Sequence, residues 1–417
     1  MSGLFFMKNK FMKWQKKSSA AIKETVFAAL NKNLNYRETK ILGLPATYLD
    51  QEQFYFDAPF LDEAPFLSVL IANPNHIGCH THSAGESYFS GTQALEIDLI
   101  KVCAEDIFNA EEGNYDGYVA TGGTEANIQA QWIFRNYFQK EHGAELSEVG
   151  LLFSEDAHYS AHKGCNLLGI KSIQVDIDEN RSWDLNDLEN KLIQAKANGI
   201  NYLIVHLSMG TTMFGSVDRP DPILAVIKKH CAHFFTHIDA AFGGFIYPFT
   251  ADNFKLNLAN PDIHSVTIDG HKMLQAPYGT GIFICKKGLM EYAQTEEASY
   301  VQGSDFTLCG SRSGANAVSI WMILMTHGYA GWQYLMGNLI DRTDHICDRL
   351  DQMEIRYFRE PKMNIVAINA KDISADLAKK YHLVADNFES PSWWKIVVMT
   401  HAKKHIIDEF LINLQKK

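Results

Sequence analysis

The chain has 417 residues, of which 46% are apolar and 21% are charged, which is ordinary for a globular protein. Its formal net charge of −11, with no long Lys- or Arg-rich tract, argues against nucleic acid as the main partner. Seven scattered cysteines without a CxxC pair favour free thiols, and no apolar run approaches the length of a membrane span. These features predict a cytoplasmic protein.

The first 85 residues predict an N-terminal lobe rich in helix and loop. Its basic and aromatic start, MSGLFFMKNKFMKWQKK, lacks the continuous apolar core of a signal peptide. A membrane-surface or targeting helix is one interpretation of this segment. We favour the other, an arm that packs on a partner subunit.

From about residue 117 onward, short apolar runs alternate with helix-like stretches. The predicted strands are 118–121, 150–154, 171–176, 202–208, 233–239 and 265–269, and the predicted helices between them are 125–140, 157–168, 184–198 and 220–231. Near-continuous apolar strands separated by helices are typical of a mostly parallel sheet covered on both faces. Further apolar runs at 363–370 and 394–400 predict strands of a smaller C-terminal α/β domain. The predicted domains are therefore 1–85, 86–300 and 301–417.

Ligands of such sheets bind beyond the carboxyl ends of the strands, so the residues that follow each strand are candidates for a site. In YVATGGTEAN the run into Gly122, Gly123 and Thr124 precedes a predicted helix. Paired glycines let backbone N–H groups approach an anion, and a helix N-terminus adds its dipole. A phosphate or carboxylate fits there, although a tight turn without a ligand explains the motif about equally well.

Two charged residues end later strands. Asp239 closes HFFTHID and is followed by small residues that leave room for a flat ring, although alone it also fits a capping role. Lys272 follows SVTIDGH, and lysine is almost never buried without a partner. An amine held in a partly desolvated place suits a Schiff-base lysine. An anion cradle, a buried Asp and a strand-end Lys together match pyridoxal 5′-phosphate, which has a phosphate, a ring nitrogen that must stay protonated and an aldehyde.

Over about residues 70–410 the sequence resembles the group II pyridoxal-phosphate-dependent amino-acid decarboxylases. The similar blocks, in collinear order, are YVATGGTEAN, SEDAHYSAHKG, GTTMFGSVD, HIDAAFGGFIYPF, SVTIDGHKM, YVQGSDFTLCGSRSG and WKIVVMTHAKKHIIDEFL. The run 300–314 and the last block are most similar to bacterial histidine decarboxylases and plant serine decarboxylases. The GGTEAN block is also similar to archaeal tyrosine/aspartate decarboxylases. The resemblance implies the fold-type I, aspartate aminotransferase-like architecture, with a seven-stranded, mostly parallel sheet and a small C-terminal domain.

The resemblance also implies roles for single residues. Lys272 would carry the cofactor, and Asp239 would pair with its ring nitrogen. His158 and Ala241 would pack on the two ring faces. The remaining cofactor contacts would come from Gly123, Thr124 and His271 at the phosphate and from Thr211 near the ring oxygen.

Other candidate residues concern the substrate. Arg312, in CGSRSGAN, suits a carboxylate or phosphate because a guanidinium binds such groups with two hydrogen bonds. The usual GSRNGH pattern is altered here, which leaves the substrate open. The loop with His76, His80 and His82 fits a substrate pocket, structural histidines or, as the weakest reading, a metal cluster, so we expect no metal. Tyr300 is a candidate proton donor.

The leading functional interpretation is α-decarboxylation of an L-amino acid, with histidine as first substrate and serine, aspartate, glutamate or an aromatic amino acid as alternatives. A carbon–carbon lyase of the sphingosine-phosphate lyase type is a second interpretation. A third is a relative that has lost activity, but the intact GGT, Asp239 and Lys272 set argues against it. The resemblance further implies a homodimer with composite sites, to which the segment 296–310 contributes from the partner.

Overall fold

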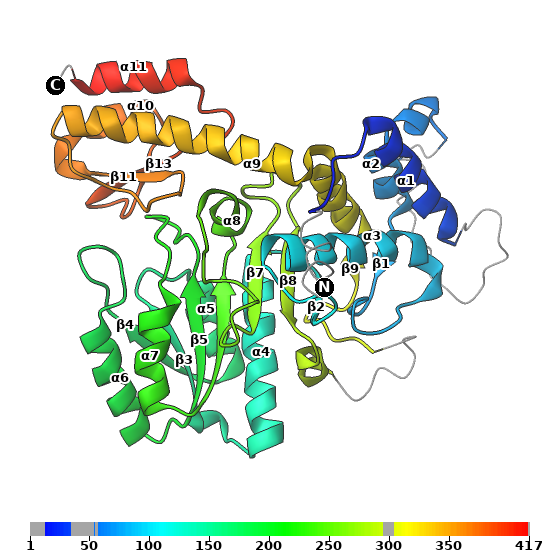
Figure 1. Cartoon of the computed structure of the whole chain (residues 1–417), viewed down its shortest axis with the longest axis horizontal. Helices are drawn as coiled ribbons and strands as arrows, with labels where there is room; N and C mark the ends of the chain where they lie inside the picture. The colour runs from blue at the N-terminus through cyan, green and yellow to red at the C-terminus, as the bar shows by residue number, and fades with distance from the viewer. Residues whose placement is uncertain (1–12, 35–53, 55–56, 295–303, 416–417) are drawn as a thin grey trace, which may run out of the picture.

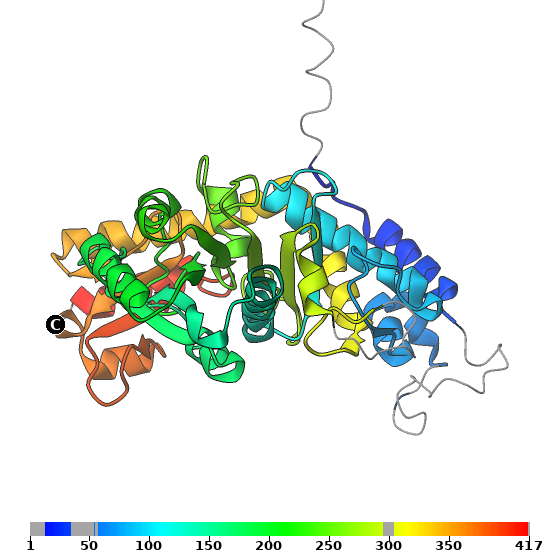
Figure 2. The same ribbon diagram turned by 90° about the horizontal axis from the view of Figure 1, so that it is seen from below.

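The computed structural model describes residues 13–34, 54, 57–294 and 304–415. A central sheet lies between a helical N-terminal lobe and a C-terminal domain, and the long helix α9 (Gly314–Gln352) runs from one to the other (Figure 1). Seen at right angles, the molecule is elongated, with the two lobes at opposite ends (Figure 2).

The central sheet has seven strands in the order β2-β8-β7-β6-β5-β3-β4. Strand β8 runs antiparallel to both of its neighbours, β2 and β7, while the remaining neighbouring pairs are parallel. The mostly parallel seven-stranded sheet that the sequence predicts is therefore confirmed. The strands are β2 (Tyr115–Ala120), β3 (Val149–Ser154), β4 (Lys171–Val175), β5 (Tyr202–Ser208), β6 (His233–Asp239), β7 (Ser265–Asp269) and β8 (Gly281–Lys286).

Helices cover both faces of this sheet because alternate strand residues point to opposite sides. On β3, Leu151 and Phe153 join one hydrophobic cluster and Leu152 joins the other. The first cluster receives α4 (Gly123–His142) and α5 (Ser160–Leu168), and the second receives α3 (Ser90–Lys101), α6 (Leu185–Ala197) and α7 (Pro220–His230). Burial on both faces explains why the inner strands read as nearly continuous apolar runs, whereas the edge strand β4 leaves Lys171, Ser172 and Gln174 exposed.

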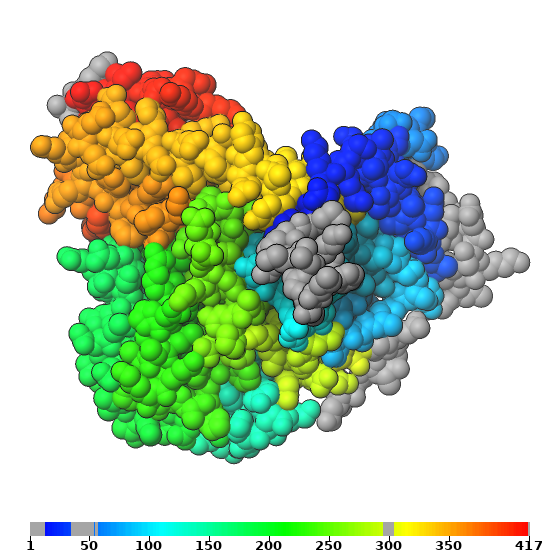
Figure 3. All heavy atoms as spheres, in the orientation of Figure 1, coloured from blue at the N-terminus to red at the C-terminus, as the bar shows by residue number. Residues whose placement is uncertain are grey.

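The C-terminal domain contains a four-stranded antiparallel sheet in the order β10-β11-β13-β12. Its strands are β10 (Tyr357–Phe358), β11 (Ile365–Asn369), β12 (Val384–Ala385) and β13 (Trp393–Val397), and its helices are α10 (Ala375–Lys380) and α11 (Lys404–Gln415). Space-filling atoms show this domain and the N-terminal helices as two lobes set apart at the top of the view (Figure 3). The exact domain boundaries remain a prediction.

The N-terminal lobe packs on the first half of α9. It contains α1 (Ser19–Lys32), α2 (Pro65–Ala72) and a short pairing of β1 (Asn75–His76) with β9 (Arg312–Ser313). Ahead of α1, Trp14 is buried and its indole N–H donates to the carbonyl of Leu324 at 2.9 Å. Helix α9 bends at Gly328, where a Cβ atom would lie 2.5 Å from the backbone nitrogen of Lys16. Residues 13–17 therefore pack on their own chain, while residues 1–12 of the predicted arm lie outside the described residues.

Among the described residues, no helix is both long enough and apolar enough to cross a membrane. The seven cysteines all lie in the described part of the chain and form no disulfide.

Candidate active site

The predicted cofactor residues meet at the carboxyl-terminal edge of the large sheet. Two adjoining cavities share the residues His158, Asp239, Ala241 and Lys272. The first has a volume of about 310 Å³ and is also lined by Gly123, Thr124 and His271. The second, of about 220 Å³, extends past Thr211 to the C-terminal domain. All eight residues that the sequence predicted for the cofactor therefore line one or both cavities.

The loop between β2 and α4 forms an anion cradle. Helix α4 begins at Gly123, so its free backbone N–H groups and its dipole face the first cavity. A Cβ atom at Gly123 would lie only 2.8 Å from the Asp269 carboxylate, which excludes any larger residue there. In the same cavity, Nδ1 of His271 is buried and has no hydrogen-bond partner among the described residues. A phosphate can satisfy both groups.

The Lys272 amine lies in this cavity next to a carboxylate that the sequence analysis did not single out. Its Nζ is 3.0 Å from Oδ2 of Asp269, and the Lys272 side chain keeps one third of its surface exposed while Asp269 is buried. The lysine at the end of β7 is thus neither an isolated buried charge nor a fully solvated one. An amine held in this way is accessible to an aldehyde.

Asp239 is buried at the end of β6 with several groups that stabilise its charge. The Ala241 backbone N–H donates to Oδ1 at 3.0 Å, and the Asn127 amide donates to Oδ2 at 2.8 Å. Burial raises the pKa of Asp239, but His206, Lys272 and the Ala241 N–H outweigh it, so this pKa stays well below its usual range. The carboxylate is therefore anionic at neutral pH and can keep a protonated ring nitrogen charged.

His158 and Thr211 line the cavity walls. Burial lowers the pKa of His158. The carboxylate of Asp239 raises this pKa, but the charges of Lys272 and His206 lower it further, so the net shift is downward. The hydroxyl of Thr211 is bonded to that of Ser216 at 2.7 Å, which fixes its position. A neutral imidazole between the two cavities can lie flat against an aromatic ring.

Lys395 on β13 is a second amine at the site, and it was missed in the sequence. It lines the second cavity with Lys272 and donates to the Thr212 carbonyl at 2.8 Å. Burial lowers its pKa, and the charge of Lys272 lowers it further. The sequence feature that could have identified it is a lysine inside the otherwise apolar run WKIVVMT, comparable to the position of Lys272 shortly after an apolar run.

The structure corrects the expected position of Arg312. It is 5% exposed, and its guanidinium donates to Glu96, to the Val119 carbonyl and to the Gly78 carbonyl. Neither cavity that Lys272 lines includes it. Glu96 also accepts the Val119 N–H at 2.8 Å. The Arg312–Glu96 pair therefore binds the backbone N–H and carbonyl of Val119 at the outer edge of strand β2, which no other strand of the described residues pairs with.

The loop with His76, His80 and His82 also lies beside buried carboxylates rather than in the cavities on Lys272. Nδ1 of His76 bonds to Glu96 at 2.7 Å, and Nδ1 of His82 lies 3.3 Å from Asp116. His80 is buried 3.3 Å from Glu96, but neither of its ring nitrogens has hydrogen-bond geometry to a described partner. His80 and His82 thus do not line the cavities on Lys272, and the substrate-binding role expected for them stays a prediction.

Ligand atoms of His76, His80 and Glu96 lie within 4.8 Å of one another. Arg312 already neutralises the charge of Glu96, which disfavours a cation beside it. The expected absence of a metal stays a prediction. Tyr300 and most of the segment 296–310 lie outside the described residues.

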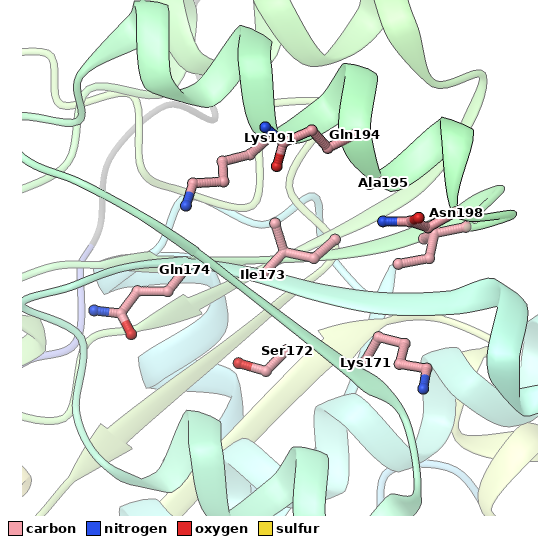
Figure 4. A pocket seen from close by; sticks show the side chains of 9 residues that line it. Lys171, Ser172, Ile173, Gln174, Lys191, Gln194, Ala195 and Asn198 are labelled. Carbon is pink, nitrogen blue, oxygen red and sulfur yellow. The ribbon is translucent and has the colours of Figure 1, made fainter.

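A hollow of about 530 Å³ lies elsewhere, between the edge strand β4 and helix α6. It is lined by polar residues that include Lys171, Gln174 and Lys191, with Ile173 at its base (Figure 4). It holds neither a paired Asp and Lys nor a glycine-rich turn. Its size therefore does not make it a competitor for the cofactor cavity.

The chain belongs to the pyridoxal-dependent decarboxylase family, because residues 92–371 match the conserved domain of these enzymes. It is 44% identical over 405 residues, or 97% of both chains, to tryptophan decarboxylase of Clostridium sporogenes. It is 29% identical over 361 residues to a probable L-tyrosine/L-aspartate decarboxylase of Methanocella arvoryzae, which covers 84% of this chain and 92% of that protein. Its fold is similar to that of L-methionine decarboxylase from Streptomyces sp. 590, with TM-score 0.68, 20% identity and coverage of 95% and 93%.

These comparisons confirm the expected family, fold type and cofactor, and make the protein a pyridoxal-phosphate-dependent amino-acid decarboxylase. They do not support the finer resemblance to histidine decarboxylases, because the relative at 44% identity bears the name of an aromatic amino-acid decarboxylase. The anion cradle, the ionised Asp239 and the accessible Lys272 amine fit pyridoxal 5′-phosphate group by group.

The buried ion pair predicts a large stability effect for Arg312. In Arg312→Met the Glu96 carboxylate loses its cationic partner, and unfolding in urea should show a loss of about 3–5 kcal/mol. The double variant Glu96→Gln/Arg312→Met removes both charges and should recover part of this loss. Unchanged stability of Arg312→Met would contradict a structural role and return Arg312 to the substrate.

His80 predicts a pH dependence of stability. Burial lowers its pKa to about 4, with His76 and Arg312 acting in the same direction and Glu96 opposing them. Between about pH 4 and 6.5 the unfolded chain then binds a proton that the folded chain does not, so stability rises with pH across this window, by on the order of 2 kcal/mol from this group.

Urea unfolding at a series of pH values measures this contribution. The slope of unfolding free energy against pH should be smaller in His80→Leu than in the wild type. His405→Leu, which changes an exposed histidine, is the matched control and should keep the wild-type slope. Equal slopes for His80→Leu and the wild type would rule out the buried neutral state.

Proposed function

We propose that the protein decarboxylates an aromatic L-amino acid, with tryptophan as first candidate. The main support is the 44% identity to a tryptophan decarboxylase over nearly the whole of both chains. The second cavity adds to it, because Phe242, Ile365 and Val397 give it an apolar wall suited to a flat side chain. Tyrosine is the second candidate, since the Methanocella relative bears that name with aspartate.

The proposed roles of the residues follow their positions. When bound, pyridoxal 5′-phosphate supplies an electron sink for the electron pair of the broken carbon–carboxylate bond. Lys272 would bind its aldehyde, Asp239 would hold a proton on its ring nitrogen, and His158 and Ala241 would pack on its two faces. Gly123, Thr124 and His271 would hold the phosphate, and Thr211 would hold the ring oxygen.

Lys395 orients the α-carboxylate of the substrate in this proposal. A cation that bound this group tightly would stabilise the starting state and slow the loss of CO₂. The Lys395 amine already donates to the Thr212 carbonyl, so its interaction with a carboxylate is shared and moderate. Orientation without strong charge neutralisation is what decarboxylation needs.

A cytoplasmic homodimer also belongs to this proposal. The second cavity is bounded on the described chain by both domains, and the segment 296–310 is expected to complete the partner's site. Light scattering should give twice the mass of one chain. An active monomer would contradict the composite site.

A substrate panel tests the proposed activity. Cofactor-loaded protein is incubated with tryptophan, tyrosine, phenylalanine, histidine, serine, methionine, aspartate and glutamate, and CO₂ release is measured. The highest kcat/KM is expected with tryptophan, because its indole buries the largest apolar surface against the apolar wall of the second cavity. A clear preference for histidine or for an acidic amino acid would refute the aromatic assignment.

Two variants serve as controls for this panel. Borohydride reduction should fix the cofactor on Lys272, and Lys272→Ala should carry no label. Asp239→Ala should still bind the cofactor covalently but lose at least about a hundredfold in turnover, as when a key electrostatic group is removed. A label on another lysine would overturn the assignment of the cofactor lysine whatever the substrate.

A further inference from the structure

A continuous chain of hydrogen bonds runs behind the cofactor cavity from His158 to Ser265. Nδ1 of His158 bonds to the Ser160 hydroxyl at 2.9 Å, and this hydroxyl accepts from the Asn127 amide at 3.0 Å. The other side of the Asn127 amide bonds to Nε2 of His237 at 2.9 Å, and Nδ1 of His237 bonds to the Ser265 hydroxyl at 2.8 Å. Asn127, Ser160, His237 and Ser265 are fully buried, so water does not compete for these bonds.

The charge of Asp239 fixes the orientation of the Asn127 amide. A carboxylate oxygen can only accept, so the amide nitrogen of Asn127 must face Oδ2 of Asp239, at 2.8 Å. The amide oxygen then faces Nε2 of His237 and must accept from it. Burial holds the pKa of His237 well below its usual range, so its ring is neutral and its Nδ1 accepts from Ser265.

The same reasoning fixes the proton on His158. The Ser160 hydroxyl accepts from Asn127, so its own hydrogen is free to be donated to Nδ1 of His158. The backbone N–H of Ser160 also points to this nitrogen, at 3.3 Å, and a backbone N–H can only donate. The backbone contact requires Nδ1 to be an unprotonated acceptor, and the hydroxyl contact is compatible with this. The single proton of the neutral ring must then be on Nε2.

We propose that Asn127 and Ser160 are positioning residues that hold His158 as a neutral imidazole with its proton on Nε2. Nε2 has no partner among the described residues, and His158 lines both cavities. The network therefore presents a hydrogen-bond donor to the reaction site without adding a positive charge. The consequence for catalysis rests on the proposed function, whereas the proton position does not.

A neutral His158 matters because of what lies beside it. A cationic imidazole stacked on a protonated pyridine ring would repel it, and a positive charge near the substrate carboxylate would oppose the loss of CO₂. The ionisable groups that act on His158 are Asp239 and Asp269, which favour its protonation, and Lys272 and His206, which oppose it. The network to Asp239 thus lets one carboxylate keep the cofactor ring charged while the facing imidazole stays neutral.

Nitrogen NMR of the full-length, cofactor-free protein with ¹⁵N-labelled histidine tests the proposal. The chain has 17 histidines, and the His158 signals are assigned by their loss in His158→Phe. Near neutral pH, Nδ1 should resonate in the unprotonated range and Nε2 in the protonated range. In Ser160→Ala, Nδ1 should move toward the value of a free unprotonated nitrogen, because it loses one donor.

Ser265→Ala is the matched control, since it removes a buried hydroxyl at the far end of the same chain and should move the His237 signals while leaving those of His158 unchanged. Asn127→Ala should move both sets. In the loaded enzyme, Ser160→Ala should lower kcat by about tenfold with little change in KM, as for the loss of one hydrogen bond. A protonated Nδ1 in the wild type, or unmoved His158 signals in Ser160→Ala, would overturn the proposal. Either result is independent of which amino acid is decarboxylated.

Discussion

A carboxylate that is buried with its charge intact must be surrounded by groups that donate to it, and Asp239 meets this condition at the end of β6. Its partners come from three separate parts of the chain. The Ala241 backbone and Asn127 of helix α4 donate hydrogen bonds, and Nε2 of His206 on strand β5 lies 3.5 Å away. The large domain can place them together because parallel strands end at one edge of the sheet. Any arrangement that left this charge unpaired would cost several kcal/mol.

A second buried carboxylate, that of Glu96, is used differently. It binds Arg312, His76 and the N–H of Val119 and so joins the N-terminal loop and the start of α9 to the edge of the sheet. The neighbouring Thr81 caps the same edge by exchanging hydrogen bonds with Gly117. Strand β2 thus has an edge that is closed by side chains, which protects it from pairing with other strands.

The sequence was sufficient for most of the large sheet because its inner strands are largely buried on both faces and read as apolar runs, whereas the edge strand β4 buries only one face. It was also sufficient to predict which residues line the two cavities on Lys272, because they lie at or shortly after the ends of strands. It was insufficient for Arg312 and His80, because a guanidinium or imidazole suits a substrate and a buried ion pair equally well, and only the fold shows that Glu96 lies beside them. Lys395 and Asn127 were missed because they reach the cavity and Asp239 through contacts between elements far apart in the chain.

The contact of Trp14 with Leu324 also bears on how the chain acquires its structure. The two residues are separated by 310 positions, and the bend at Gly328 that receives Lys16 lies still further along. During synthesis the segment around Trp14 emerges early, yet its binding place does not exist until helix α9 has been made. The apolar surface around Trp14 must therefore stay unpacked through most of translation. The α/β domain, which lies between Trp14 and α9 in the sequence, can already assemble during this time. The segment around Trp14 is thus made early and is among the last described parts of this protein to reach its final position.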